Sequence, residues 1–215
     1  MNQKEIKNTD LNFDAGKQGS LKISNLCVAR GLKLIIDKLN HFQSQGEMCC
    51  LVGPNGSGKS TLLLALAGRL PIFSGGFICS FPRIYIGHSD GLSDSISGEK
   101  NLTDWGKLYG FSVKKNKIEQ ALSNFETNSF ANVPVKLLSR GQKRRLALTR
   151  LHLAPPKSIW LLGEPNVGLD ARAVKTLDKI INLHVAAGGM VLVATHTPVA
   201  KTTPQRKLRL KGAIS

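Results

Sequence analysis

The chain has 215 residues, of which 41% are hydrophobic and 20% charged, a composition typical of one soluble globular domain that excludes a disordered or fibrous chain. No uninterrupted apolar stretch approaches the roughly 20 residues needed to cross a bilayer, so any role at a membrane requires a partner. The formal net charge of +16 would attract nucleic acid, anionic lipid or acidic ligands, unless it only marks a generally basic solvated surface.

The chain begins with a segment that differs from the rest. Residues 1–20 mix acidic and basic side chains without an apolar centre, which predicts a flexible lead-in and no targeting signal. Strands are predicted at residues 21–28 and 32–37, with a turn around Gly31, and a short buried strand at residues 46–53 is bounded by glycines. A glycine-rich loop and a helix at residues 62–70 follow directly, and another short strand is predicted at residues 83–89.

From about Leu92 the pattern becomes helical. Ile118, Ala121, Leu122 and Phe125 recur at the spacing of one helix face, which predicts a small helical lobe at about residues 92–150. Its last helix is expected to begin after an N-cap at Ser139 and to end at the prolines 155 and 156.

The remaining elements alternate between strand and helix. A strand is predicted at residues 158–163, a helix at residues 171–189 and a strand at residues 190–196. The chain is therefore expected to be a single domain of the α/β class at residues 21–215. It would have a mostly parallel sheet, helices on both faces, a small antiparallel β part and the inserted helical lobe. Functional sites in such folds lie at the carboxyl ends of the strands.

The glycine-rich loop, "GPNGSGKST", satisfies the pattern G-x-x-x-x-G-K-[ST] between a strand and a helix, the context that this motif requires. Its backbone amides and the helix N-terminus would bind phosphates, Lys59 would reach the β- and γ-phosphates, and the Ser60 hydroxyl would be a ligand of Mg²⁺. An ordinary glycine-rich turn is the alternative, which this context disfavours. The predicted nucleotide-binding residues are Gly53, Pro54, Asn55, Gly56, Ser57, Gly58, Lys59, Ser60 and Thr61.

The stretch "LSRGQ" at residues 138–142 resembles the LSGGQ-type signature of the ATP-binding-cassette family. In that family two nucleotide domains pair head to tail, so the resemblance implies that Ser139, Gly141 and Gln142 cover the ATP bound to a second copy. A helix N-terminus suits such contact with an anion. A merely capped basic helix is the alternative, and the position of the motif just before an apolar strand argues against it.

The same resemblance assigns roles to three further residues. It implies that Glu164 polarises the attacking water, that Asp170 in "VGLD" contacts the partner domain, and that His196 in "VATH" senses the γ-phosphate. A solvated acid at the end of a strand and a structural histidine are the alternatives for Glu164 and His196.

Three positions depart from the family pattern. Gly163 stands where the family carries an aspartate that helps to hold Mg²⁺, which leaves three possibilities: a slow ATPase, an ATP-dependent switch with little turnover, or a degenerate chain. Because the other motif residues remain, impaired activity is favoured over none. His88 replaces the usual glutamine and still offers a ring nitrogen towards Mg²⁺ or water, which makes it a further catalytic candidate. No adenine-stacking aromatic is evident near Arg30, which could stack through its guanidinium.

A narrower resemblance is to the ATP-binding subunits of the haem exporters of cytochrome c maturation. It is carried by Gly87, His88, Gly91, Glu99, Asn101, Leu102 and residues 138–151. It implies use of ATP and Mg²⁺, a haem-transporting translocase, an integral membrane partner subunit and pairing with a second nucleotide-binding domain, expected to be another copy of this chain.

The expected location is peripheral, on the cytoplasmic face of a bacterial inner membrane or the matrix face of a mitochondrial one. The helical lobe near His88 would carry the surface that docks the membrane partner. The alternatives are the ATPase subunit of another cassette transporter and a soluble cassette ATPase acting on nucleic acid. Soluble members usually have two cassettes or a long coiled-coil insert, and this chain has neither. No stable nucleic acid partner is therefore expected.

Overall fold

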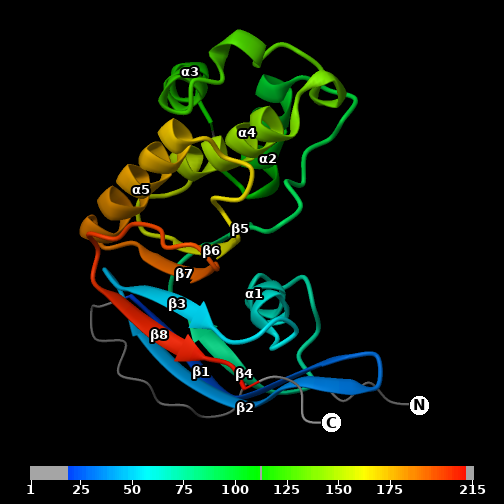
Figure 1. Cartoon of the computed structure of the whole chain (residues 1–215), viewed down its shortest axis with the longest axis vertical. Coiled ribbons are helices and arrows are strands. Elements are labelled where there is room, and N and C mark those ends of the chain that lie inside the picture. Colours follow the sequence, from blue (N-terminus) through cyan, green and yellow to red (C-terminus); the bar gives the residue numbers. More distant parts are fainter. Residues whose placement is uncertain (1–18, 112, 212–215) are drawn as a thin grey trace.

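The computed structural model describes residues 19–111 and 113–211 (Figure 1). The predicted lead-in at residues 1–20 lies almost entirely outside them. The chain starts with two long antiparallel strands, β1 (Ser20–Arg30) and β2 (Lys33–Ser44), joined by the predicted turn, in which Gly31 has a φ of 58°. Together with β4 (Ser74–Cys79) they form a three-stranded antiparallel sheet in the order β2-β1-β4.

The second sheet has five strands in the order β5-β6-β7-β3-β8, and every neighbouring pair is parallel. These strands are β3 (Met48–Val52), β5 (Arg83–Ile86), β6 (Ile159–Gly163), β7 (Met190–Ala194) and β8 (Gln205–Arg209). The predicted α/β class, with a parallel core sheet and a small antiparallel part, is confirmed.

Within the described residues, five α-helices connect the strands. They are α1 (Lys59–Leu66), α2 (Gly98–Leu108), α3 (Lys115–Asn124), α4 (Arg140–Leu153) and α5 (Ala171–Ala186), with two short 3₁₀ turns at Asn128–Phe130 and Val135–Leu137. Figure 1 shows α2, α3 and α4 at one end of the molecule and the antiparallel sheet at the other. None of the helices within the described residues is long and apolar enough to span a membrane.

The parallel sheet separates two hydrophobic clusters, because alternate residues of each strand point to opposite faces. In β6, Trp160 and Leu162 pack with residues of α2 to α5, whereas Ile159 and Leu161 pack with α1 and the antiparallel sheet. Helix α1 therefore lies between the two sheets, which fixes the loop in front of it.

Local sequence signals explain where the helices start. Ser139 is the N-cap of α4 in a capping box with Gln142, and Asp170 caps α5 by accepting a hydrogen bond from the Ala173 amide at 2.8 Å. The predicted buried face of α3 is also confirmed, because Ile118, Ala121, Leu122 and Phe125 are each no more than 4% exposed.

Two strands escaped prediction. Strand β4 contains Gly75 and Gly76, which weaken strand propensity, and β8 is a basic segment at the edge of its sheet with one partly buried residue, Leu208. The helix predicted at residues 62–70 begins instead at Lys59 and ends at Leu66, just before Gly68, which has a φ of 72°. Strands β4 and β8 thus complete the two sheets at positions where the hydrophobic pattern of the sequence is weak.

Candidate active site

The carboxyl ends of neighbouring parallel strands bring the predicted motifs to one edge of the sheet. Strand β3 leads into the glycine-rich loop, β6 ends at Gly163, and β7 is followed by His196. Because β7 lies between β6 and β3, residues more than 100 positions apart in the sequence meet at this edge. This is the position at which open α/β sheets bind ligands.

The glycine-rich loop has the backbone that its motif predicts. Gly56 and Gly58 have φ angles of 79° and 96°, and Gly58 is the N-cap of α1. A β-carbon at Gly58 would lie 3.0 Å from the Ile35 side chain, so both conformation and space favour glycine. The Lys59 ammonium donates hydrogen bonds to the carbonyl oxygens of Gly53 (2.8 Å) and Pro54 (3.0 Å). The Lys59 side chain thus folds back over the glycine-rich loop.

The hydroxyl groups of the loop differ in their surroundings. Ser60 and the loop residues Pro54 and Asn55 are exposed, whereas Thr61 is buried at the start of α1. The Ser57 hydroxyl is buried and has no hydrogen-bond partner. A cavity of about 370 Å³ opens beside Ser57, between β2 and the end of β8. A buried unpaired hydroxyl next to positive backbone dipoles fits a loop that binds an anionic ligand.

Glu164 and His196 lie next to each other, as predicted for a shared site. The Glu164 carboxylate accepts a hydrogen bond from the His196 amide (3.3 Å), and its other oxygen lies 3.6 Å from the imidazole Nε2. The Glu164 amide donates to the Ala194 carbonyl at 2.7 Å, which ties it to the end of β7. The His196 side chain is 61% exposed and that of Glu164 22%, so both can meet a ligand.

Gly163 offers only backbone atoms to this site. A β-carbon there would lie 3.3 Å from the Gly87 α-carbon and 3.6 Å from the His88 nitrogen. The described residues contain no cluster of three His, Cys, Asp or Glu side chains able to hold a metal ion. Ser60, the predicted Mg²⁺ ligand, lies at the start of α1, and Glu164 and His88 are further polar groups along the same edge. His88 is exposed in the loop after β5.

The signature residues form a separate part of the surface. Within the part of the chain that the structure describes, residues 139–142 make no hydrogen bond or ion pair with the glycine-rich loop. The Ser139 hydroxyl accepts from the Gln142 amide (3.2 Å), and the Gln142 side chain accepts from the Ser139 amide (2.8 Å). A β-carbon at Gly141 would lie 3.2 Å from the Gly168 carbonyl oxygen, so the signature packs against the loop that leads to Asp170.

One buried residue of the site region was missed by the sequence interpretation. Arg144 is only 4% exposed and contacts the carbonyl oxygens of Gly163 and Glu164. A signal existed, since Arg144 is four positions before Leu148 and so falls on the buried face of α4. Arg30, considered for adenine stacking, is exposed at the end of β1.

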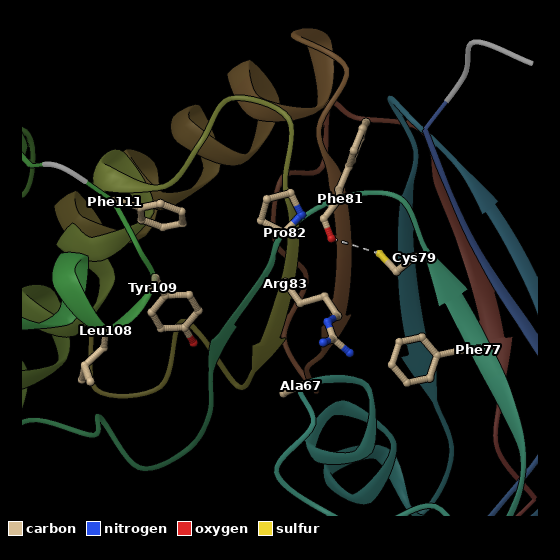
Figure 2. Close-up of a pocket in the computed structure, with 9 residues that line it drawn as sticks. All are labelled: Ala67, Phe77, Cys79, Phe81, Pro82, Arg83, Leu108, Tyr109 and Phe111. Atoms are coloured by element: carbon tan, nitrogen blue, oxygen red, sulfur yellow. Dashed lines mark hydrogen bonds between the residues drawn. The ribbon is translucent and has the colours of Figure 1, made fainter. Parts of the chain in front are cut away.

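A groove of about 700 Å³ with aromatic and charged walls opens away from this edge (Figure 2). It lies between the end of α1, strand β4, the start of β5 and the end of α2. Its walls include Phe77, Phe81, Tyr109 and Phe111, and the side chain of Leu108 at its rim is 85% exposed. Arg83 lies among these residues, so the groove offers both aromatic and charged groups to a ligand.

The ABC transporter family model matches residues 36–167. A relative from Roseobacter denitrificans, "Cytochrome c biogenesis ATP-binding export protein CcmA", is 40% identical over 178 residues, which cover 82% of this chain and 84% of that protein. The protein of the same name from Paramagnetospirillum magneticum is 38% identical over 189 residues, covering 81% and 87%.

Two solved structures have the same fold. "Structure of ATP binding subunit of ABC transporter" superposes with a TM-score of 0.77 at 22% identity, covering 91% of this chain and 89% of that one. The "dimeric structure of a post-hydrolysis state of the ATP-binding cassette MJ0796 bound to ADP and Pi" gives 0.74 at 20% identity, covering 89% and 94%. At these identities the likeness supports the fold alone.

Proposed function

This chain belongs to the ABC transporter family, and from that premise we propose that it powers haem export, or release of a haem-loaded chaperone, in cytochrome c maturation. Binding of ATP with Mg²⁺, and ATP hydrolysis coupled to transport, are general properties of the family. The observation that carries the proposal is the meeting of the Lys59 loop with the Glu164–His196 pair at the ends of neighbouring strands. The haem-related part rests on the likeness to the two export proteins.

The glycine-rich loop would bind the phosphates of ATP. Lys59 would exchange the carbonyl oxygens of Gly53 and Pro54 for the β- and γ-phosphates, and the amides at the start of α1 would supply further donors. The unpaired Ser57 hydroxyl lies within the same loop. These groups supply the positive field that a nucleotide triphosphate requires.

Glu164 and His196 would act on the attacking water and the γ-phosphate. The Glu164 carboxylate would accept a hydrogen bond from the attacking water and so orient the water oxygen. The largely exposed His196 would contact the γ-phosphate. Mg²⁺, when bound, would supply positive charge to the phosphates. Ser60 would hold this ion, and because Gly163 adds no carboxylate, we propose that hydrolysis is weakened and not abolished.

A second copy of the chain would complete the site. Ser139, Gly141 and Gln142 form a capped helix end that makes no polar contact with the chain's own glycine-rich loop, so it is free to meet ATP on a partner. Asp170 would lie at the same dimer contact, since its loop packs against Gly141. Its side chain also caps α5, so it serves the fold whether or not it touches the partner.

The membrane subunit would dock in the groove of Figure 2. The groove joins the end of α2, in the helical end of the molecule, to the start of β5, whose other end carries His88. Leu108 at its rim is largely exposed, whereas Tyr109 and Phe111 are held by stacking with a centroid distance of 5.9 Å. A short segment of a membrane protein that carries both an apolar and an acidic side chain fits aromatic walls that contain Arg83. The chain would thus work as a peripheral subunit on the cytoplasmic face of a bacterial inner membrane.

The test of this function is ATP hydrolysis by the purified chain together with its membrane subunit. Glu164→Gln is expected to abolish turnover and keep ATP binding, because it removes the charge of the carboxylate and little volume. Glu119→Gln is the matched control, since Glu119 is an exposed carboxylate on α3. Equal rates in the two variants would contradict the role of Glu164.

The haem-related part needs its own measurement. In a bacterial host that lacks its own cytochrome c biogenesis ATP-binding export protein, the chain expressed with its membrane subunits is expected to restore haem-stained c-type cytochromes. If the chain hydrolyses ATP but does not restore c-type cytochromes, the result would favour the alternative that it is the ATPase subunit of another transporter. Retention on nucleic acid at moderate salt, without any membrane partner, would favour a soluble ATPase instead.

A further inference from the structure

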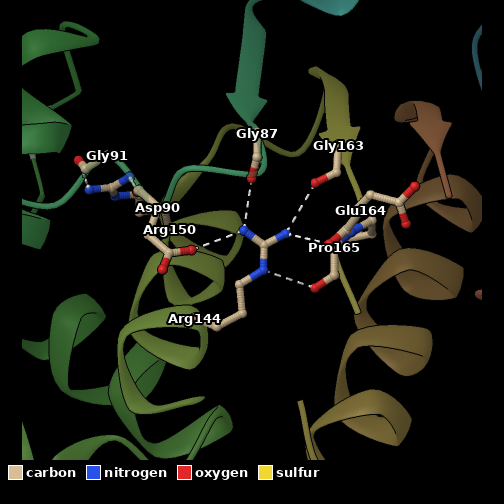
Figure 3. A network of polar contacts seen from close by, with 8 residues as sticks. All are labelled: Gly87, Asp90, Gly91, Arg144, Arg150, Gly163, Glu164 and Pro165. Carbon is tan, nitrogen blue, oxygen red and sulfur yellow. Dashed lines mark hydrogen bonds and ion pairs between the residues drawn. The ribbon is translucent and has the colours of Figure 1, made fainter. Parts of the chain in front are cut away.

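Arg144 of α4 connects two segments of the active-site edge through a fully engaged guanidinium (Figure 3). Its five N–H donors make five hydrogen bonds. The acceptors are the carbonyl oxygens of Gly87 (2.8 Å), Gly163 (3.2 Å), Glu164 (2.7 Å) and Pro165 (3.2 Å) and the carboxylate of Asp90 (3.0 Å). The residue is 4% exposed, so this arrangement leaves no donor for water.

A buried charge of this kind does not serve helix packing alone. Well-packed apolar residues often stabilise a core as well as a buried ion pair does, and the pair then fixes one geometry. The neighbouring Arg150 is also buried but less fully engaged than Arg144. Its guanidinium donates hydrogen bonds to the carbonyl oxygens of Asp90 and Gly91, and its buried Nε has no hydrogen-bond partner. Burial lowers the pKa of Arg150 to about 10, so it remains charged at neutral pH.

On one side, Arg144 holds the turn that carries the proposed catalytic carboxylate. It binds three consecutive carbonyl oxygens, those of residues 163–165. Glu164 in the middle has a φ of 48°, a left-handed conformation that non-glycine residues adopt only when their surroundings impose it. The guanidinium supplies that constraint, while the Glu164 side chain points away from it (Figure 3) and lies 3.6 Å from the His196 Nε2.

On the other side, Arg144 holds the loop that follows β5. It contacts Gly87 and Asp90, the residues on either side of His88 and Ser89. The two segments approach closely, since a β-carbon at Gly163 would lie 3.3 Å from the Gly87 α-carbon. One side chain therefore sets the spacing between the turn of Glu164 and the loop of His88.

We propose that Arg144 is a positioning residue for ATP hydrolysis, which places Glu164 and the His88 loop relative to each other through their backbone carbonyl groups. It does not touch the nucleotide. The inference rests on the proposed function and adds to it a residue of α4, the helix that begins at the signature, so a shift of α4 would reach both segments at once.

The test compares Arg144→Lys with the parent chain and its membrane subunit. A lysine keeps the charge but cannot reach five acceptors, so we expect kcat to fall by about tenfold to 100-fold, as small misplacements of reacting groups do, with the dissociation constant for MgATP changed by less than about threefold. Arg145→Lys is the matched control, because Arg145 is the next residue of α4 and lies over the Phe130 ring. An unchanged kcat in Arg144→Lys, or an equal loss in the control, would overturn the proposal.

A second measurement does not depend on turnover. The chain has five histidines, so the imidazole proton resonances of His88 and His196 can be followed by NMR at fixed pH. Both are expected to shift in Arg144→Lys and to stay in place in Arg145→Lys. If the parent hydrolyses no ATP, the proposed function fails, and these resonances still decide the positioning role: unshifted resonances would refute it. If Arg144→Lys does not fold, Asp90→Asn is expected to give the same two effects more weakly, and its failure to do so would refute the role.

Discussion

Restoring the missing carboxylate by Gly163→Asp is the sharpest perturbation that this site allows. The new β-carbon would lie 3.3 Å from the Gly87 α-carbon, so the backbone must give by only a few tenths of an ångström. Because alternate residues of β6 point to opposite faces of the sheet, the added carboxylate would point, like the side chain of Leu161, to the face that carries α1. Overpacking by a few atoms costs about 1–3 kcal/mol, which is less than the roughly 5–15 kcal/mol by which a folded domain is stable. A folded variant is therefore expected.

The gain is expected in the dependence on Mg²⁺. A hydrogen bond to a charged group contributes about 1.5–3 kcal/mol, and 1.4 kcal/mol corresponds to a factor of ten in an equilibrium constant. One additional carboxylate in the oxygen shell of the metal should therefore lower the half-saturating Mg²⁺ concentration by about tenfold to 100-fold. The maximal rate should rise less, because Glu164 and Lys59 are already present in the parent.

The assay is ATP hydrolysis across a Mg²⁺ titration for the parent, Gly163→Asp and Gly163→Asn. The asparagine has nearly the same volume as the aspartate and no charge, so it separates the carboxylate from the packing change. Adding Glu164→Gln to each should remove turnover and leave the Mg²⁺ requirement for ATP binding. If Gly163→Asn and Gly163→Asp shift the titration equally, or if neither does, the missing carboxylate does not limit this enzyme.

Two further predictions concern docking and acid stability. Leu108→Ser should reduce co-purification with the membrane subunit without changing ATP hydrolysis by the isolated chain. Leu183→Ser, which changes an exposed leucine on α5, should alter neither. Equal losses of co-purification in the two variants would argue against docking in the groove. Burial lowers the pKa of His184 to about 4, and its ring stacks on Trp160 with a centroid distance of 3.7 Å. Because the unfolded chain binds the proton more readily, stability is complete above pH 6.5 and should fall by about 3 kcal/mol towards pH 4. His184→Gln should flatten this dependence in thermal unfolding, and an unchanged slope would refute it.

The motifs were predictable because each depends on a few residues in a fixed local context. The position of Gly58, directly before a helix, has a positive φ that favours glycine, and the G-K-[ST] motif around Lys59 predicts a glycine at this position. The end of β6 is visible as an apolar run closing at Gly163, so the amino-acid pattern alone places Glu164 at the sheet edge. The proposed domain limits at residues 21–215 remain a prediction.

What escaped prediction depends on contacts between distant segments. The basic side chains of α4 differ in their surroundings, since Arg140 is exposed and Arg144 is buried. Composition cannot separate them, although the helical spacing between Arg144 and Leu148 could have. Strand β8 was likewise hidden, because its pairing with β3 and not its own residues makes it a strand.

The arrangement around Gly163 separates the geometry of the site from its metal chemistry. The turn that carries Glu164 is fixed through backbone groups, by Arg144 on one side and by the Ala194 carbonyl on the other. An aspartate side chain at position 163 is not needed for this geometry, so its absence leaves the Glu164–His196 pair in place. The physical consequence of the glycine is therefore confined to the ligands available to Mg²⁺, which is why a changed metal requirement is expected and a folding defect is not.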